Sequence, residues 1–283
     1  AAGYDDDHYL SYCARMQGYD QAALYLGLEP EAVDHLQAAE VVFVGNSRLV
    51  FAMSNNVVTN FFDRLGARHY MLGFLHDERD AYFRGLLGRL NATAKVYVIN
   101  ADPFFTRDYS EISGPLAHDR KDALDRYATV KSLQRWHRSY CSDAGSVLGF
   151  LLCGDTAALY RSRRHGGMRM DHLLRRSRSA PLDRDQWNLF DDGNPIKSVD
   201  EFRMENIDSY VENARSFAKL LPVGADCVII TVVPSRNSTK AVGRRVASAL
   251  GARFIAPDLE GLETGDADHL NVESAKRWAA ALL

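Results

Sequence analysis

The sequence alternates short apolar runs with longer segments in which apolar residues recur every three or four positions. The apolar runs have strand length and lie at 41–44, 68–74, 95–99, 227–233 and 252–255. The segments after them carry helical stripes; the one after the second run contains Tyr82, Phe83, Leu86, Leu87 and Leu90. Apolar strands separated by amphipathic helices are typical of a parallel sheet covered on both faces. The pattern therefore predicts a three-layer α/β/α sandwich with a mainly parallel sheet.

Two parts of the chain depart from this alternation. Residues 1–40 have apolar positions at helical spacing and are predicted to form an N-terminal helical segment. Residues 41–283 then form a single α/β domain, with Asp77 as the N-cap of the helix after its second strand. Within that domain, about 106–205 is a turn-rich, partly helical insertion, since the strands on either side have to complete one sheet. An insertion at the carboxyl edge of a sheet commonly shapes the substrate pocket.

The insertion concentrates positive charge in an otherwise slightly acidic chain. A cluster of arginines within it comprises Arg161, Arg163, Arg164, Arg169, Arg175, Arg176 and Arg178. They form either a binding surface for an anionic polymer, such as an acidic polysaccharide, or simply a solvated helix face.

Composition excludes several classes of protein. The 283 residues are 46% hydrophobic, and 34 Lys and Arg stand against 37 Asp and Glu, so no overall positive field favours nucleic acid. No apolar run approaches the roughly 20 residues of a membrane-spanning helix. The chain begins at Ala1 without a leader pattern, so we expect any signal peptide or membrane anchor to have preceded it.

The four cysteines carry little chemistry. They include no C-x-x-C pair and no histidine at zinc spacing, so we expect no metal site. Cys227 is interpreted as a buried thiol within a strand, and whether Cys141 and Cys153 form a disulfide stays open.

The candidate chemistry begins where the first apolar strand ends, at Gly45-Asn46-Ser47-Arg48. This position places Ser47 at the turn into a helix, near N-terminal amides that favour negative charge. The turn is not the Gly-x-Ser-x-Gly elbow of α/β-hydrolases, because Leu49 stands in place of the second glycine. Alone, such a serine is more typical of a helix cap than of a nucleophile.

A second motif precedes the last helix and makes a nucleophile the better interpretation. His269 can serve as the base, and Asp266, three residues earlier in the same loop, can curl back to orient the imidazole. Asp268 adjoins His269 and is expected to point elsewhere.

Together these motifs resemble the SGNH/GDSL-type serine esterases and acyltransferases. That family has a Gly-Asp-Ser nucleophile motif, an oxyanion glycine, an asparagine and a C-terminal Asp-x-x-His; Gly73 and Asn100 here follow the second and third strands. The match covers about residues 41–105 and 206–283. The resemblance implies a flavodoxin-like sheet of SGNH type.

The sequence departs from the family pattern at two places. Asn46 replaces the usual Asp, a change also seen in divergent members that act on cell-surface polysaccharides. The third motif reads Asn100-Ala101-Asp102; we assign Asn100 as the oxyanion donor, because an amide donates hydrogen bonds whereas an ionised Asp102 would oppose an oxyanion.

The resemblance implies a serine-dependent esterase or O-acyltransferase, most simply for O-acetyl groups, acting on a carbohydrate or polysaccharide outside the cytoplasm. Ser47, His269 and Asp266 would form the triad, and the Ser47 and Gly73 amides with Asn100 would bind the oxyanion. We expect Arg48 to contact substrate, and Asp102 either to contact substrate or to be structural. Trp187 is also expected at the substrate, although it and the other aromatics of the insertion either stack on sugars or simply pack; the others are Tyr109, Trp136 and Phe190.

The expected partners are the polysaccharide and an acyl donor, and no cofactor is expected. Whether water or a sugar hydroxyl accepts the acyl group stays open, because both reactions use the same acyl-enzyme. The alternative is a carbohydrate-binding or assembly protein that kept the sheet without catalysis. A nucleotide-binding domain is disfavoured, because the chain has neither a Gly-x-Gly-x-x-Gly motif nor a Walker lysine.

Overall fold

The fold was obtained as a computed structural model that describes most of the chain outside the insertion. The described residues are 8–13, 18–75, 78–118, 121–129, 132, 172–180, 194–196, 206–236, 238–266 and 268–283. Several residues considered above therefore lie outside the described part: Trp136, Cys141, Cys153, Arg161, Arg163, Arg164, Arg169, Trp187 and Phe190.

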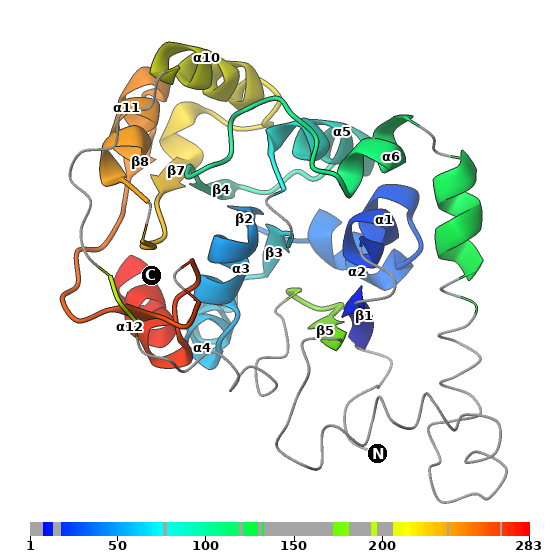
Figure 1. The fold of residues 1–283 in the computed structure, drawn as a ribbon, viewed down its shortest axis with the longest axis horizontal. Coiled ribbons are helices and arrows are strands. Elements are labelled where there is room, and N and C mark those ends of the chain that lie inside the picture. The colour runs from blue at the N-terminus through cyan, green and yellow to red at the C-terminus, as the bar shows by residue number, and fades with distance from the viewer. Residues whose placement is uncertain are drawn as a thin grey trace, which may run out of the picture.

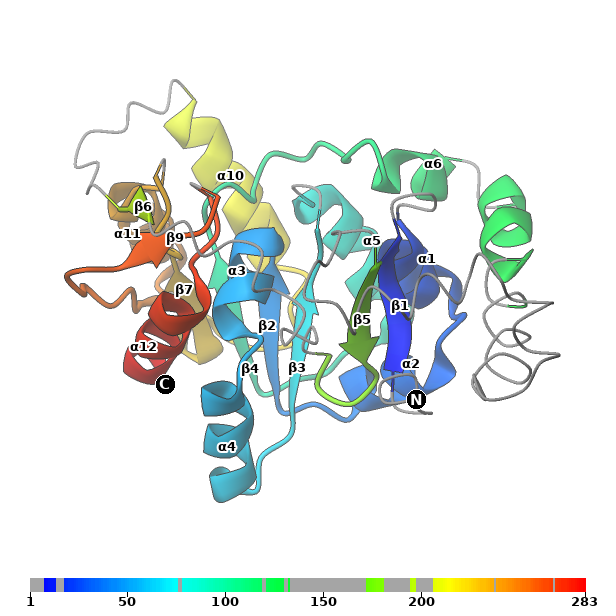
Figure 2. The same ribbon diagram turned by 60° about the horizontal axis from the view of Figure 1, so that its bottom comes forward.

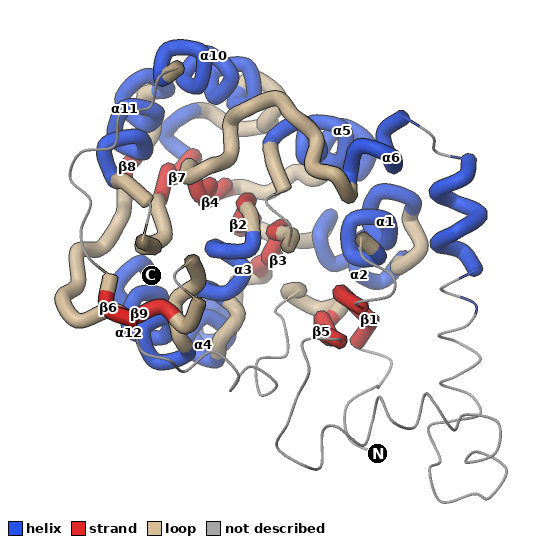
Figure 3. Tube along the Cα trace, viewed as in Figure 1, coloured by secondary structure: helices blue, strands red, loops and turns tan. Residues whose placement is uncertain are grey.

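The centre of the molecule is a parallel sheet of five strands (Figure 3). The strands are β2 (Val41–Gly45), β3 (His69–Gly73), β4 (Val96–Asn100), β7 (Val228–Thr231) and β8 (Arg253–Phe254). Their order is β3-β2-β4-β7-β8, with every adjacent pair parallel. Because β4 pairs directly with β7, the strands before and after the insertion complete one sheet, as expected.

Helices cover both faces of this sheet (Figure 1). One layer contains α3 (Ser47–Met53), α4 (Asn56–Leu65) and α12 (Val272–Leu282), and the other contains α5 (Asp80–Leu90), α10 (Ile207–Ala218) and α11 (Lys240–Leu250). The side chains between the layers are closed to solvent, among them Phe43, Ile99 and Trp278 at 1%, 0% and 0% exposure. Buried apolar strands between amphipathic helices confirm the predicted three-layer α/β/α architecture.

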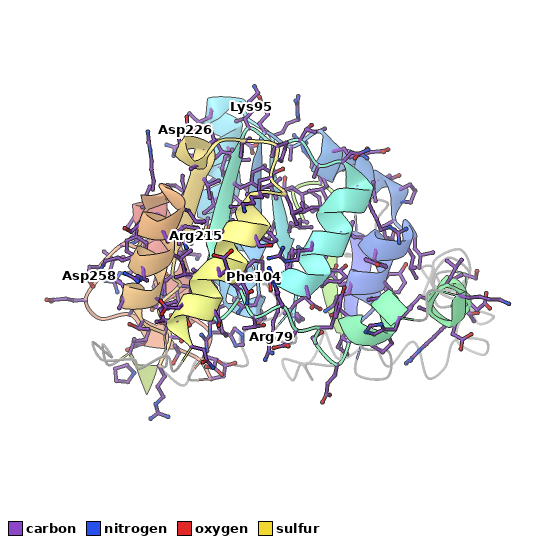
Figure 4. The ribbon with its side chains drawn as sticks, turned by 90° about the horizontal axis from the view of Figure 1, so that it is seen from above. Arg79, Lys95, Phe104, Arg215, Asp226 and Asp258 are labelled. Atoms are coloured by element: carbon purple, nitrogen blue, oxygen red, sulfur yellow. The ribbon has the colours of Figure 1, made fainter. Side chains whose placement is uncertain are left out.

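The strand order fixes where a ligand can approach. The chain moves from β2 to β3 on one side and then returns to β4 on the other, so the connections diverge above β2 and β4. In a doubly wound sheet, such a switch point leaves a crevice at the carboxyl ends of the strands. Figure 4 marks the two edges: Lys95 and Asp226 lie at the amino ends of β4 and β7, and Arg79 and Phe104 lie at the opposite, carboxyl edge.

The N-terminal region contains both helix and strand. Helices α1 (Tyr19–Leu26) and α2 (Pro30–Gln37) were expected, but residues His8–Cys13 form a strand, β1, where we predicted helix. β1 pairs antiparallel with β5 (His172–Arg176), a strand of the insertion, and Figure 2 shows the pair beside β3. The helical prediction fails for β1 because its pairing partner lies more than 150 residues away and leaves no local signal.

The remaining named elements are short: they are α6 (Ser113–His118), the 3₁₀ turn η3 (Ala225–Cys227), and the strands β6 (Asn194–Pro195) and β9 (Glu263–Thr264), which pair antiparallel. Residues 121–129 are helical as well. Cys227 ends η3 and is partly exposed, so its placement as a buried strand residue was wrong. The helix assigned to an Asp77 cap is also corrected, because α5 begins at Asp80 with Arg79 as its N-cap.

Candidate active site

Ser47 occupies the first position of α3, directly after β2. The helix cap is Asn46, whose Oδ1 accepts a hydrogen bond from the Arg48 amide at 3.2 Å. The Ser47 hydroxyl is therefore free of the capping role that is the commonest role of a serine at this position. Gly45 permits the close approach of α3 and β4, because a Cβ there would lie 2.9 Å from Leu49 Cδ2 and 3.0 Å from Asn100 Cβ.

The Ser47 hydroxyl forms a hydrogen bond with His269, which comes from the other end of the chain. His269 Nε2 lies 2.8 Å from Ser47 Oγ, and His269 Nδ1 lies 2.6 Å from Asp266 Oδ2. The three side chains thus form a continuous hydrogen-bonded chain in the order serine, imidazole, carboxylate. Both distances fall within the range expected of a nucleophile, its base and the group that orients the base.

The loop that carries His269 is fixed by its own backbone. The Glu263 carbonyl accepts a hydrogen bond from the backbone N–H of Asn271 at 3.0 Å, and the His269 carbonyl accepts one from the backbone N–H of Gly265 at 3.0 Å. Within this closed loop, Asp266 Oδ1 accepts from the amides of Asp268 and His269 at 3.0 and 2.7 Å. The second carboxylate oxygen is left to face the imidazole, as we expected from the three-residue spacing.

The carboxylate of Asp266 is held in its charged form. Partial burial works to raise its pKa, but the hydrogen bond and charge of His269, together with the two backbone amides, hold that pKa below its usual range. Asp266 is therefore ionised at neutral pH and can stabilise an imidazolium at His269.

Phe51 also positions the base, and our sequence reasoning missed it. Its ring meets the His269 ring edge-to-face, with centroids 4.5 Å apart and planes at 74°. Phe51 lies four residues after Ser47, one turn along α3, so that helix presents the serine and the aromatic contact on one face. That spacing was the only signal in the sequence that could have indicated the contact.

The structure corrects the expected role of Asn100. Its side chain is fully buried, and Nδ2 donates to Asn46 Oδ1 at 3.3 Å and to the Asp102 carbonyl at 3.1 Å. Its Oδ1 accepts from the Val233 amide at 3.1 Å. Because both amide hydrogens are already donated, Asn100 joins β4 to the neighbouring loops and does not present a donor to an oxyanion.

The structure also corrects the role of Gly73. Its carbonyl accepts from Arg175 Nη1 at 2.8 Å at the outer edge of β3, and the next amide, that of Phe74, donates to the Gly45 carbonyl. In an extended strand the N–H and C=O of one residue point to the same side, so the Gly73 amide faces that outer edge as well. Of the three expected oxyanion donors, the Ser47 amide at the α3 N-terminus keeps a suitable place.

Asn46 explains one departure from the family pattern. Its Oδ1 accepts from the Arg48 amide and from Asn100 Nδ2, while its own Nδ2 donates to the carbonyls of Asp102 and Pro103 at 3.4 and 3.3 Å. A carboxylate here would lose both donors and would face two carbonyl oxygens. The amide thus suits this position better than the aspartate of the family motif.

The remaining residues expected to bind substrate are placed as follows. Arg48 Nη1 lies 3.3 Å from Asp102 Oδ2, and Nη2 lies 3.1 Å from Asp268 Oδ1. Burial raises the pKa of Asp102 to about 6, with Arg48 and a hydrogen bond from the Thr239 backbone opposing that rise. Trp187 lies outside the described residues.

A cavity of about 390 Å³ opens near this edge of the sheet. It is lined by the segment after β7, the first residues of α11 and the segment after β8, and the triad lies outside the lining. Among the described residues, no cluster of three or more His, Cys, Asp or Glu side chains could hold a metal ion. No helix within the described ranges is both long and apolar enough to cross a membrane.

Comparison with known proteins does not place the chain in a family. No protein-family model, curated protein or solved structure matches it. The functional argument therefore depends on the geometry of the site.

Proposed function

We propose that the protein is a serine-dependent esterase or O-acyltransferase of SGNH type that acts on an O-acylated, most simply O-acetylated, carbohydrate or polysaccharide. The observation that carries the proposal is the chain from Ser47 Oγ to His269 Nε2 at 2.8 Å and from His269 Nδ1 to Asp266 Oδ2 at 2.6 Å. The site lies at the carboxyl ends of the strands, where sheets of this type bind their ligands.

The first half-reaction transfers the acyl group to the enzyme. Asp266 accepts a hydrogen bond from the Nδ1–H of His269, which leaves Nε2 to take the hydroxyl proton as Ser47 Oγ attacks the ester carbonyl. The oxyanion forms near the Ser47 amide at the start of α3. His269 then returns the proton to the departing alcohol, and Ser47 is left acylated.

The second half-reaction releases the acyl group. His269 removes a proton from the acceptor, whose oxygen attacks the acyl carbonyl, and the proton returns to Ser47 Oγ. Water as acceptor gives hydrolysis, and a sugar hydroxyl gives transfer. The carbohydrate substrate and a location outside the cytoplasm rest on the resemblance to polysaccharide-modifying family members.

A second candidate function has one observation in its favour. Asn100 and Gly73, two of the three expected oxyanion donors, are engaged elsewhere. A carbohydrate-binding or assembly protein that kept the triad geometry without turnover would tolerate this loss.

An activated-serine probe separates the two candidates. We expect a fluorophosphonate to label wild-type protein at Ser47, and His269→Ala to suppress labelling, because the free hydroxyl is a weak nucleophile without its base. We expect Ser47→Ala or His269→Ala to lower aryl acetate turnover by about 10⁴-fold or more, since triad members act as a unit. Ser248→Ala, an exposed serine of α11, is the matched control. Absence of label at Ser47 in folded wild-type protein would favour the non-catalytic function.

A further inference from the structure

Arg48 connects the two segments that carry the triad. It follows Ser47 in α3, and its guanidinium reaches Asp268, which precedes His269, at 3.1 Å. Its other terminal nitrogen reaches Asp102, after β4, at 3.3 Å. Figures 1 and 2 show α3 beside the segment that leads into α12, so one side chain spans the junction between parts of the chain 220 residues apart.

We propose that Arg48 is a positioning residue that clamps the Asp266–His269 loop against α3 and so keeps His269 Nε2 in reach of the Ser47 hydroxyl. The inference rests on the proposed function and replaces the expectation that Arg48 contacts substrate. The planar guanidinium is suited to this task, because it can hold two carboxylates in fixed directions at once, which the single ammonium of a lysine does less well.

The contacts of the guanidinium favour positioning over substrate binding. Its side chain is 13% exposed, and both terminal nitrogens already face carboxylates. Arg48 with Asp102 and Asp268 has a formal charge of −1 when both acids are ionised, so the cluster offers no net positive charge to an anionic substrate.

The two contacts differ in strength. The Asp102 side chain is 8% exposed and the Asp268 side chain 51% exposed, so solvent weakens the Asp268 contact more. Asp102 therefore holds the guanidinium in place, and the contact with Asp268 fixes the loop relative to α3. Loss of Arg48 would release the loop and leave Asp102 buried without its countercharge.

Other contacts also hold the loop, so the loss of Arg48 should lower kcat only in part. The Asp266 side chain is bonded to two loop amides, and Phe51 packs against the imidazole. We therefore expect Arg48→Met to lower kcat for a neutral aryl acetate by about 10- to 100-fold, the order of loss that a small misplacement of reacting groups causes, with KM within about twofold. Arg48→Lys should lose less.

The experiment measures kcat and KM separately, together with the ¹⁵N shifts of the His269 ring, which report the hydrogen bond to Ser47. We expect the ¹⁵N chemical shifts of the His269 ring in Arg48→Met to lie between those of wild type and those of Ser47→Ala. Asp268→Asn should change the same shifts in the same direction by a smaller amount. In the double variant Arg48→Met/Asp268→Asn, the second change should add nothing to the loss in kcat, because the contact is already absent. Arg64→Met, an exposed arginine of α4, is the matched control with unchanged kinetics.

Two results would contradict the clamp. One is an unchanged kcat with a raised KM in Arg48→Met, which would assign the residue to substrate binding. The other is that the ¹⁵N shifts of the His269 ring are the same in Arg48→Met as in wild type. If Arg48→Met does not fold, Arg48→Lys and Asp268→Asn carry the same readouts. Failure of the proposed function gives a different result, because wild-type protein would then take no label at Ser47. A labelled wild type with full kcat in Arg48→Met rejects the clamp alone.

Discussion

Two neighbouring aspartates of one loop have different surroundings, and the difference can be measured. Asp266 contacts the His269 ring and two backbone amides, whereas the side chain of Asp268 pairs with Arg48 and is half-exposed. We predict that Asp266→Asn lowers kcat on an aryl acetate by about 10³- to 10⁴-fold, because an amide neither fixes the tautomer nor stabilises the imidazolium. Asp268→Asn should lose less than about tenfold, since it removes one exposed contact of the clamp. Equal losses in the two variants would contradict this placement.

At the residue scale, the sequence predicted where the candidate catalytic side chains lie in the fold better than it predicted their hydrogen-bond partners. Ser47, Asp266 and His269 could be predicted because each stands at a strand end or before a helix, where the order of motifs restricts the geometry. The partners of Asn46 and Asn100 could not, because an amide donates and accepts equally well, and which atoms lie around it depends on how β2, β4 and their loops pack. Arg48 was placed at the correct turn, but its two carboxylate partners come from distant segments.

At the scale of elements, the central strands were the most predictable part of the fold. Five apolar runs gave five strands. For β2, β3, β4 and β7, which are mostly buried, the composition shows the burial directly, whereas β8 is a short and more exposed edge strand. β1 was missed because a two-stranded pair with one distant partner has no such signature. The start of α5 was misplaced for a local reason, since Arg79 stands at the N-cap and contributes no side-chain cap.

His69 opens β3 and makes the packing of α4 sensitive to acid. The residue is 9% exposed, and its ring stacks on Phe62 with centroids 4.2 Å apart. Burial, assisted by Arg178 and opposed by Asp63, lowers the pKa of His69 to about 4. Because this folded-state pKa lies below the value in the unfolded chain, the contribution to stability is complete above about pH 6.5 and is lost as the pH falls toward 4.

We therefore predict that the free energy of unfolding falls by up to about 3 kcal/mol between pH 7 and 4 through His69 alone. Urea denaturation at intervals across this range measures the effect. In His69→Leu, which cannot be protonated, the pH dependence should be flatter by that amount. His35→Gln, at an exposed position of α2, should keep the wild-type slope. Identical slopes in His69→Leu and wild type would show that another group causes the acid sensitivity.

At the scale of the whole molecule, one arginine connects the insertion, the N-terminal region and the sheet. Arg175 was counted in a positively charged surface cluster, but it is fully buried. Nη1 lies 2.6 Å from Asp20 Oδ2, at the start of α1, and Nε donates to the Ala180 carbonyl at 2.7 Å. Its terminal nitrogens also donate to the carbonyls of Met71 and Gly73 in β3.

The sequence could not separate this residue from its neighbours, because the burial of Arg175 depends on where β5 packs. These contacts satisfy carbonyls at the outer edge of β3, which would otherwise be open to strand pairing. The Met71 amide of the same edge donates to the Ser179 carbonyl at 2.9 Å, so the segment after β5 covers the edge together with Arg175. A buried Arg175 cannot belong to the polymer-binding surface expected of the insertion. A variant that tests this surface should therefore change Arg163 and Arg164.

The buried contacts of Arg175 lead to a prediction about global stability. Truncating one partner of a buried ion pair removes the charge that stabilises the other, so we predict that Arg175→Met destabilises the protein by about 3–5 kcal/mol in urea denaturation. Arg178→Ala, an exposed arginine three residues later, is the matched control and should stay within about 0.5 kcal/mol of wild type. In Arg175→Met/Asp20→Asn, the second change should restore part of the lost stability, because it removes the buried carboxylate charge that faced the guanidinium. If Arg175→Met were as mild as Arg178→Ala, the guanidinium would contribute nothing to joining the insertion to the sheet, and the coverage of β3 would have to depend on the backbone contacts alone.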